Sequence, residues 1–527
     1  MSQRAVTLAP QTSTTHSHTV RSWVIPTFVA MIGAFMSILD TTIVNVAIPK
    51  MLVVFGTTPS GIEWVSTIYT LALGVVTPLA GWLGDYLGYR RLYIAALAVF
   101  TLGSGLCAVA GSLGSLIAFR VLQAVGGGLI MPMVMAMVMQ MVPRERFGTA
   151  MGIFGMALLL APAIGPTVGG YLVQYVDWRW VFTINVPIGI LGIFLARLVL
   201  PAFDDEEAGS FDWWGAAFVA ISLFSLLLAL SEGQSWGWGS ESIVYLFYIA
   251  AVFMGLFIWR ELTTPEPLLD LRLFRYPSFT LGNLVLFIMT IGMFGALFYL
   301  PIFLQDIRGL GAFQAGLTLL PPALVTMVTM PVAGFLYDKL GPRLIVPLGI
   351  LFLALSTFLF RNLSVETALS TIILWNSIRS FGMGLSMMPI QSAVLSEVPS
   401  AEASRASSIT NIVSRLAGSF GIALLTIIFT NNQALQTSTL RTALSSTDPV
   451  RVQGMAQLQA ALMHQGMSPL QAQAVAGALI QGQLSTLAFT HALNNVFVIL
   501  SFSVLLGLIP AFFLKKGSVR RGGLAVE

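Results

Sequence analysis

The sequence predicts an all-α integral membrane protein with fourteen transmembrane helices. Of the 527 residues, 56% are hydrophobic and only 9% are charged, whereas soluble domains carry about 25% charged residues. The apolar residues form runs of about 20, which is the length that a helix needs to cross a hydrocarbon layer about 30 Å thick. Because a soluble fold cannot bury this much apolar surface, we expect a lipid bilayer to surround the chain.

Fourteen such runs follow one another, each bounded by Gly, Pro or charged residues. The first run comes directly after a polar tail at residues 1–21. It is too long for the core of a signal peptide, so we expect it to remain as a span. The expected spans cover residues 23–49, 62–83, 92–110, 115–141, 148–175, 179–200, 213–231, 243–260, 278–305, 315–337, 343–360, 369–394, 407–430 and 490–514.

The basic residues orient these spans. With both termini placed in the cytoplasm, 17 of the 26 Lys and Arg fall on the cytoplasmic side and six on the opposite side. Such a bias is typical of multi-pass membrane proteins, because cytoplasmic loops carry an excess of Lys and Arg. It favours an even number of spans.

An internal repeat divides the chain into two homologous halves. Segments 81–91 and 334–343 start 253 residues apart and share Gly, Asp, Gly and Arg at the same four offsets. Parallel halves of six spans place a substrate site between them, near the middle of the membrane. The expected domains are a cytoplasmic tail at 1–21, a six-helix bundle at 22–200, a linker with two inserted spans at 201–277, a six-helix bundle at 278–514 with an external segment at 431–489, and a cytoplasmic tail at 515–527.

Asp40 is an acid inside the first span, about 22 Å into the layer. An ionised carboxylate there costs about 2.5–3.5 kcal/mol on insertion scales. Desolvation favours its protonation and a nearby cation opposes it, so its charge could switch during transport. Arg120, early in the fourth span, is the candidate partner. The alternative is a permanent structural ion pair.

The repeated segments are the candidate conformational gate. Asp85 and Asp338 lie in short turns beside helix N-termini and arginines, where charge-to-dipole and ionic contacts can hold one conformation. The alternative is that both acids only form turns. The predicted gate residues are Gly81, Asp85, Gly88, Arg91, Asp338 and Arg343.

Residues 161–170 in the fifth span combine glycine and proline. The glycines remove side-chain bulk and the prolines leave carbonyls unbonded, which predicts a close-packed, bendable helix face. We expect this face to seal the cavity on the outer side. The residues concerned are Pro162, Gly165, Pro166, Gly169 and Gly170.

Polar, aromatic and methionine side chains in the spans are candidates for the walls of the substrate cavity. Flexible, polarisable methionine suits promiscuous apolar binding, although helix packing or contact with lipid explains such residues equally well. The candidates are Asn45, Trp64, Tyr69, Gln123, Met131, Phe298 and Phe303.

Four stretches resemble one transporter family. They are Leu39–Pro49 in the first span, Arg120–Gly127 in the fourth, 161–170 in the fifth and Trp178–Gly189 in the sixth. With segment 81–91, and in this order, they resemble the major facilitator superfamily. Within it, they are similar to the fourteen-span drug:proton antiporters of the EmrB/QacA type, in particular to EmrB-like multidrug exporters.

The resemblance implies the major facilitator fold and proton-coupled export of lipophilic, often cationic, drugs or toxic compounds by alternating access. It places the chain in a bacterial plasma (inner) membrane, with no cofactor beyond the proton gradient. In that family the motif at Arg120 is linked to proton transfer, and the motif at 161–170 marks antiporters. A flippase or exporter of a lipid, lipid precursor or siderophore on the same fold is the alternative.

The external segment 431–489 contains a helix start at Ser468-Pro469-Leu470-Gln471. Serine caps the helix, proline occupies its first position and glutamine reaches back to the cap. The helix could rest on the bilayer, cover the transporter's mouth or dock a partner. For EmrB-like proteins the resemblance implies a periplasmic adaptor and an outer-membrane channel as partners.

Several other classes of function are excluded or disfavoured. None of the four lysines is followed by Ser or Thr, so no phosphate loop drives transport with ATP. Cys107 is the single cysteine, which leaves no disulfide framework and no cysteine-based metal site. Lys and Arg are scattered rather than clustered, which argues against nucleic acid. We also find no grouping of residues typical of an enzyme's active site.

Overall fold

A computed structural model describes residues 23–143, 146–202, 210–399, 402–443 and 449–514. The predicted tails 1–21 and 515–527 and residues 203–209 of the predicted linker lie outside these residues. The described chain is helical throughout, without a strand. Its helices are α1 Val24–Phe55, α2 Pro59–Val76, α3 Ala80–Leu87, α4 Tyr89–Ala108, α5 Leu113–Met141, α6 Phe147–Tyr175, α7 Trp180–Thr183, α8 Asn185–Val199, α9 Trp213–Trp236, α10 Glu241–Thr263, α11 Pro277–Ile302, α12 Ala312–Leu340, α13 Pro342–Leu359, α14 Leu369–Ser396, α15 Ala403–Ala443, α16 Pro449–His464, α17 Pro469–Leu506 and α18 Leu508–Phe512.

The helices confirm the predicted membrane fold. Thirteen stretches of the described chain are helical, long and apolar enough to cross a membrane. Helix α14, with 28 residues, is not among the thirteen, but it packs against α11, α12 and α13 inside the bundle. It is less apolar because it carries Asn376 and Arg379 among several serines. Counting α14, the fold fits the expected fourteen spans.

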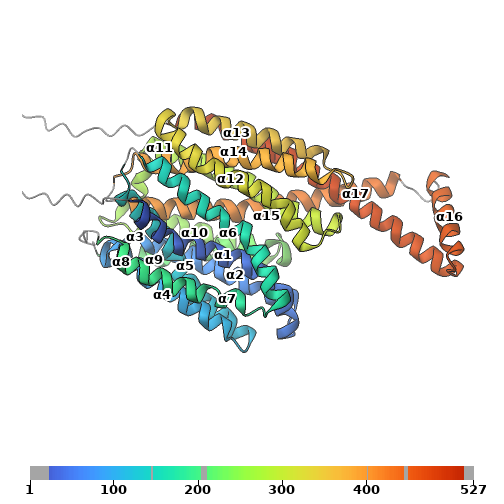
Figure 1. Cartoon of the computed structure of the whole chain (residues 1–527), viewed down its shortest axis with the longest axis horizontal. Helices are drawn as coiled ribbons and strands as arrows, with labels where there is room; N and C mark the ends of the chain where they lie inside the picture. The colour runs from blue at the N-terminus through green and yellow to red at the C-terminus, as the bar shows by residue number, and fades with distance from the viewer. Residues whose placement is uncertain (1–22, 144–145, 203–209, 400–401, 444–448, 515–527) are drawn as a thin grey trace, which may run out of the picture.

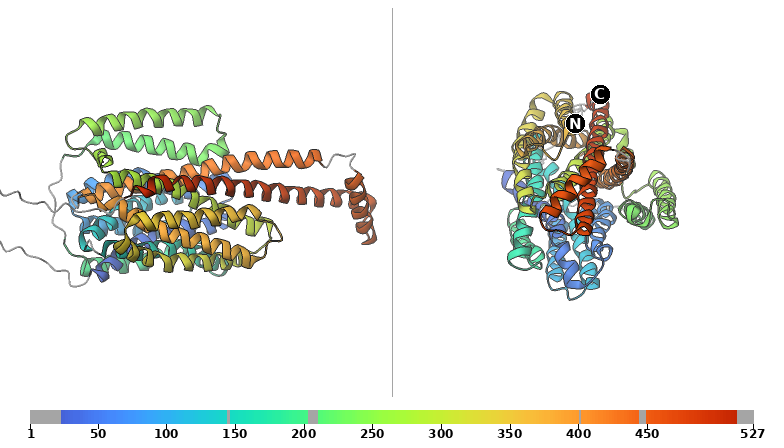
Figure 2. Two further views of the ribbon diagram at one scale, coloured as in Figure 1. Left: turned by 90° about the horizontal axis from the view of Figure 1, so that it is seen from above. Right: turned by 90° about the vertical axis from the view of Figure 1, so that its right-hand side faces the viewer.

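Two bundles and a peripheral pair of helices make up the molecule. Helices α1–α8 form one bundle and α11–α18 the other, and α6 and α12 run side by side where the bundles meet (Figure 1). Helices α9 and α10 pair with each other and lie to one side of both bundles (Figure 2). The inserted linker therefore adds spans without entering the boundary between α6 and α12.

The segment predicted to be an external loop is mostly helical. The expected span 407–430 is part of the longer helix α15, with 41 residues, and the expected span 490–514 covers the end of α17, with 38 residues, and all of α18. With α16, the end of α15 and the start of α17 form a helical hairpin, residues 431–443 and 449–489, that projects along the bundle axis beyond the other helices (Figure 1). In this conformation the hairpin points away from the bundle rather than folding across its end.

The predicted start of α17 is confirmed. The Ser468 side chain accepts a hydrogen bond from the Gln471 backbone at 3.4 Å, and the Ser468 backbone donates to Gln471 Oε1 at 3.1 Å. This reciprocal capping box fixes where α17 begins.

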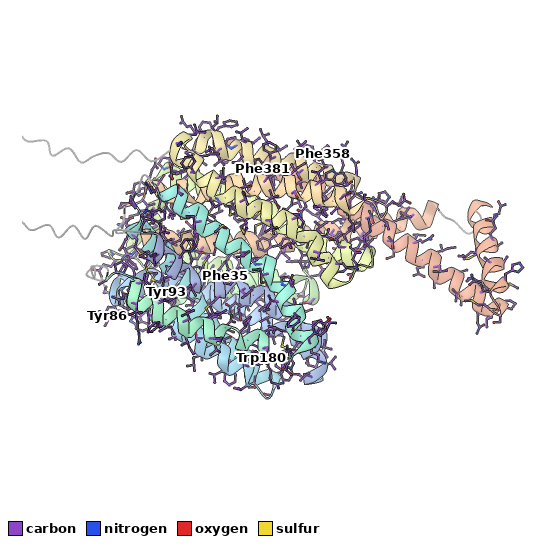
Figure 3. The ribbon with its side chains drawn as sticks, viewed as in Figure 1. Phe35, Tyr86, Tyr93, Trp180, Phe358 and Phe381 are labelled. Carbon is purple, nitrogen blue, oxygen red and sulfur yellow. The ribbon has the colours of Figure 1, made fainter. Side chains whose placement is uncertain are left out.

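Apolar side chains cover the outside of the bundles as well as their interior. Tyr86 and Trp180 are 62% and 49% exposed, and they lie towards opposite ends of the first bundle (Figure 3). Phe381 and Phe358 lie on the second bundle in the same view. Surfaces this apolar suit contact with lipid.

Glycine lets neighbouring helices approach closely within each bundle. A Cβ added at Gly126 of α5 would overlap the Phe100 backbone nitrogen and the Ala96 carbonyl oxygen of α4. Gly382 of α14 meets the Gly349 carbonyl oxygen of α13 in the same way, at 2.6 Å. Small residues at such crossings are the usual means of packing helices in membranes.

Gly126→Ala is expected to lower the free energy of unfolding by about 1–3 kcal/mol, because the added methyl group overpacks the contact with α4. Gly114→Ala in the same helix is the control, since nothing lies within 4 Å of its added Cβ. Thermal unfolding of the purified proteins, followed by tryptophan fluorescence, compares the two. Equal midpoints would contradict the importance of this crossing.

Candidate functional site

Asp40 lies at the centre of a buried polar network in the first bundle. Its side chain has no exposed surface. Arg120 Nη1 donates to Asp40 Oδ2 at 2.5 Å and Gln123 Nε2 donates to Oδ1 at 2.8 Å. Asn185 Nδ2 donates to Oδ1 at 3.0 Å. Three donors from two other helices therefore hold one carboxylate in the interior.

The network also satisfies Arg120, which is 1% exposed. Its Nε donates to the Val65 carbonyl oxygen at 3.1 Å, and its Nη1 also donates to Gln123 Oε1 at 2.8 Å. The guanidinium carbon lies 3.9 Å from the centre of the Tyr69 ring, a cation–π contact. The predicted pairing of Asp40 with Arg120 is thus present, with helix α2 supplying the remaining contacts.

Asn185 is a member that sequence reasoning did not assign to the site. It begins α8, and besides Asp40 its amide donates to Ser104 Oγ at 3.1 Å. Ser104 in turn donates to the Phe182 carbonyl oxygen at 2.8 Å. The sequence did contain a signal for Asn185: it is a polar amide within the motif Trp178–Gly189, and an asparagine in an apolar span needs a polar partner.

This arrangement can couple a proton to a change in contacts. An ionised Asp40 accepts from three donors and neutralises Arg120. A protonated carboxyl group carries no charge and has less capacity to accept. Protonation of Asp40 would therefore weaken its ion pair with Arg120. The buried guanidinium of Arg120 would then need another hydrogen-bond acceptor.

The repeated acids connect the two bundles at one end. Asp338 of α12 accepts hydrogen bonds from the backbone of Gly148 and Thr149, both at 2.9 Å, and from the Thr149 hydroxyl at 2.8 Å. Gly148 and Thr149 lie in the first turn of α6, in the opposite bundle. A carboxylate at a helix N-terminus is favoured by the helix dipole and by the free backbone donors.

Asp85 makes the reciprocal contact. It lies in α3 of the first bundle and pairs with Arg405 of α15 in the second, at 3.4 Å, while Tyr89 donates to it at 3.0 Å. Each repeated acid thus contacts the start of a helix in the other bundle. We call the end of the molecule with Asp85, Arg405, Asp338 and Gly148 the closed end.

The other predicted gate residues lie around these acids. Gly88 and Gly341 have φ values of 79° and 76°, in the left-handed region that favours glycine, and each is followed directly by a helix. Gly81 packs against Arg405, and Arg343 Nε donates to the Leu514 carbonyl oxygen at 3.2 Å. Arg91 lies in the first turn of α4, and its side chain is exposed.

Glu402 lies beside Arg405 at the closed end. Burial raises the pKa of the Glu402 carboxyl group, neighbouring Asp270 raises it further, and Arg405 lowers it. Arg405 therefore has more than one acid within electrostatic range, which strengthens its attachment to this end of the molecule.

Helices α6 and α12 approach each other most closely at the closed end. Gly334 of α12 is pressed against the Gly148 carbonyl oxygen, and a Cβ at Gly152 would lie 2.6 Å from the Met330 carbonyl oxygen. Near the other end of α12, the nearest atom to a Cβ at Gly316 is Thr167 Oγ1, at 3.9 Å. The contact between these helices is thus tightest where the acids lie.

The glycine and proline residues of 161–170 lie in α6, and two of the glycines, Gly165 and Gly169, face α1 close to Asp40. Gly165 packs against Thr42, and a Cβ at Gly169 would lie 2.9 Å from the Ile43 side chain. Gly170 meets nothing within 4 Å. Pro162 and Pro166 stand inside α6 without ending it. The expected close packing is present, and the role in sealing the outer side stays a prediction.

The structure does not bring the seven cavity candidates together. Tyr69 and Gln123 belong to the Asp40 network, whereas Phe303 is completely buried in an apolar cluster of the second bundle. Asn45 accepts from Ser66 at 2.8 Å, and Phe298 is 46% exposed. Trp64 and Met131 pack against separate apolar clusters. Their role in binding substrate stays a prediction.

Two bundles related by an internal repeat and joined at one end by reciprocal charged contacts define a multi-pass membrane transporter. The sequence matches the Major Facilitator Superfamily over residues 30–422. The chain therefore belongs to the major facilitator superfamily, whose members are transporters rather than enzymes.

Relatives and a solved structure agree with this assignment. The chain is 31% identical over 506 residues to the multidrug resistance protein B homolog of Mycobacterium tuberculosis, covering 93% of this chain and 89% of that protein. It is 31% identical over 492 residues to the multidrug export protein EmrB of Escherichia coli, covering 92% and 94%. The crystal structure of the human organic anion transporter MFSD10 superposes with a TM-score of 0.59, covering 93% and 99%, and its 13% identity shows the fold alone.

Asp40→Asn and Arg120→Gln are each expected to lower the free energy of unfolding by about 3–5 kcal/mol, because each leaves a buried group without its partner. The double variant should lose less than the sum of the two, by about 0.5–3 kcal/mol. Chemical or thermal unfolding of the four proteins measures this coupling. Strictly additive losses would show that the two groups do not depend on each other.

Asp338→Asn is expected to favour opening of the closed end, because the contact between a carboxylate and a helix N-terminus contributes about 0.3–2 kcal/mol. The population of closed molecules should fall about two- to thirtyfold relative to open ones. Spin labels at exposed Tyr86 and Leu340, in a chain with Cys107 replaced, report the distance across this end. Asp306→Asn, which changes an exposed acid, is the control. Identical distance distributions in the two variants would show that the Asp338 contact does not hold the closed end together.

Proposed function

We propose that the chain exports lipophilic drugs or toxic compounds in exchange for protons, with Asp40 as the site that couples the two. The observation that carries the proposal is the buried Asp40 carboxylate, held by Arg120, Gln123 and Asn185. The names of two relatives, a multidrug resistance protein and a multidrug export protein, supply the class of compound. That these compounds are often cationic is the expectation from the family resemblance.

The mechanism follows from the energetics of the network. Proton binding neutralises Asp40 and leaves the Arg120 charge uncompensated, so the protonated state favours a different arrangement of α1, α5 and α8. Release of the proton restores the ion pair. Moving one charge through 100 mV supplies about 2.3 kcal/mol, so the proton gradient provides the work and no cofactor is needed.

Alternating access would proceed by breaking and remaking the closed end. We place both termini in the cytoplasm of a bacterium and the chain in its inner membrane, which makes the closed end cytoplasmic. The Asp85–Arg405 pair and the Asp338 contact with α6 then hold the outward-facing state. Opening them exposes the substrate site to the cytoplasm.

The helical hairpin is the proposed attachment point for a periplasmic adaptor and, through it, an outer-membrane channel. Its direction supports this reading, since it extends away from the bundle (Figure 2). Leu470 and Leu435, which are 79% and 61% exposed, provide apolar side chains for a partner.

Proton coupling predicts that adding substrate to liposomes will move protons only when Asp40 can ionise. The wild type, Asp40→Asn and the control Asp306→Asn are reconstituted with an internal pH dye, and ethidium is added. Proton movement should be abolished in Asp40→Asn and retained in Asp306→Asn, whose carboxylate is exposed. Protein-free liposomes correct for proton movement that does not depend on the protein.

Two results would count against the proposal. Proton movement of equal size in Asp40→Asn would remove Asp40 from the coupling step. Absence of any protein-dependent proton movement, together with transfer of a labelled lipid between leaflets, would favour the lipid flippase instead.

A further inference from the structure

The inserted helices α9 and α10 meet at the closed end around two buried acids. Phe211, just before α9, packs against Trp82 of α3 with ring centroids 4.6 Å apart, which places the start of α9 at this end. Asp212 is 5% exposed, and Glu261, in the last turn of α10, has no exposed surface. The network around Asp40 uses neither acid.

Asp212 has the partners that an ionised carboxylate needs. It caps α9 by accepting from the Gly215 backbone at 3.1 Å. Arg260 Nε donates to both of its oxygens at 3.1 Å. Asp212 therefore joins the start of α9 to the end of α10, and it occupies the Nε of Arg260.

Glu261 has only part of what an ionised carboxylate needs. Its Oε2 accepts from the Leu269 backbone at 3.1 Å, whereas its Oε1 is buried without a hydrogen-bond partner. Within the described residues, no Lys or Arg forms an ion pair with it. Burying an unpaired charge is costly, whereas a protonated carboxyl group carries no charge and offers one O–H donor.

Asp212 faces the unbonded oxygen of Glu261. A Cβ added at Gly215 would lie 2.6 Å from Asp212 Oδ2 and 3.2 Å from Glu261 Oε1, so the two oxygens lie close to the same point. A neighbouring negative charge disfavours ionisation of a carboxyl group, and burial acts in the same direction. Both conditions therefore favour a proton on Oε1.

The segment between α10 and α11 adds one more acid. Asp270 directly follows Leu269 and caps the short helix η3, Leu271–Arg275, by accepting from the Arg272 backbone at 2.9 Å. Arg272 and Arg275 are exposed to solvent. The charged groups around Glu261 are therefore two acids and an arginine that is already paired.

The bond from Leu269 to Glu261 ties α10 to the second bundle. Leu268 and Leu269 are 1% and 2% exposed, and they belong to the same apolar core as Phe279 near the start of α11. Glu261 therefore holds the connecting segment at the point where it enters this core.

We propose that Glu261 is a second proton-binding site, separate from Asp40, and that its proton holds the inserted helices to the start of the second bundle. With the proton on Oε1, the bond from Leu269 remains and no charge is buried unpaired. Loss of the proton leaves a negative charge beside Asp212. Moving the carboxylate into water relieves this charge and breaks the bond from Leu269, so the junction loosens when the pH at the closed end rises. The inference does not rest on the proposed export function.

The first test is the infrared absorption of protonated carboxyl groups, titrated in nanodiscs. The difference between the wild type and Glu261→Gln isolates Glu261, because Asp40 is present in both proteins. We expect a carboxylic acid band in the wild type above about pH 6, well beyond the ordinary titration of glutamate at about pH 4.3. Glu241→Gln, which changes an exposed acid in the first turn of α10, should keep the band. Asp212→Asn should shift its titration to lower pH.

The second test is hydrogen exchange of the segment 264–270, corrected for the intrinsic rate at each pH. Protection in the wild type should fall at least about tenfold from about pH 6 to about pH 9, because each pH unit beyond the titration changes the ionised fraction about tenfold relative to the neutral one. Glu261→Gln supplies a neutral group that still accepts from Leu269, so its protection should not depend on pH. Glu241→Gln should behave as the wild type does.

The same band in Glu261→Gln and the wild type would overturn the inference. Protection that is independent of pH in the wild type would also overturn it, as would a pH dependence that survives in Glu261→Gln. Asp40→Asn should keep the Glu261 band. Loss of proton movement in Asp40→Asn therefore concerns the coupling site alone, and loss of the band concerns Glu261 alone.

Discussion

The arrangement of the first bundle depends on burying one carboxylate. Asp40 has no contact with solvent, so its charge is tolerated only while Arg120, Gln123 and Asn185 donate to it. These donors belong to α5 and α8, and Tyr69 of α2 completes the surroundings of the guanidinium. The four helices α1, α2, α5 and α8 must therefore keep fixed rotations and fixed positions along the membrane normal relative to one another. A change in the charge of Asp40 acts on all of them at once, which is what a coupling site requires.

At the closed end, the two repeated acids, Asp85 and Asp338, make equivalent contacts between the bundles through different kinds of interaction. Asp85 forms an ion pair with Arg405, whereas Asp338 accepts from the backbone and side chain at the start of α6. Both contacts cross between bundles, and both hold the start of a helix. Because each depends on charge close to the surface, each is weak enough to break in a transport cycle.

The two bundles share a fold but differ in their buried charges. The first holds the ion pair of Asp40 and Arg120, whereas in the second the Nη1 of buried Arg379 has no hydrogen-bond partner among the described residues.

The sequence by itself determined the membrane fold, the two halves, and the pairing of Asp40 with Arg120, because hydropathy and rare buried charges are local properties that the membrane makes decisive. Tertiary structure alone decided that Asn185 joins the network and that Arg405 meets Asp85. It also decided that α15 and α17 continue two spans into a helical hairpin beyond the bundle. These features depend on how each helix is rotated and on contacts between distant residues: Asp40 and Asn185 are 145 positions apart, and Asp85 and Arg405 are 320 apart. The local pattern of apolar residues does not specify such contacts.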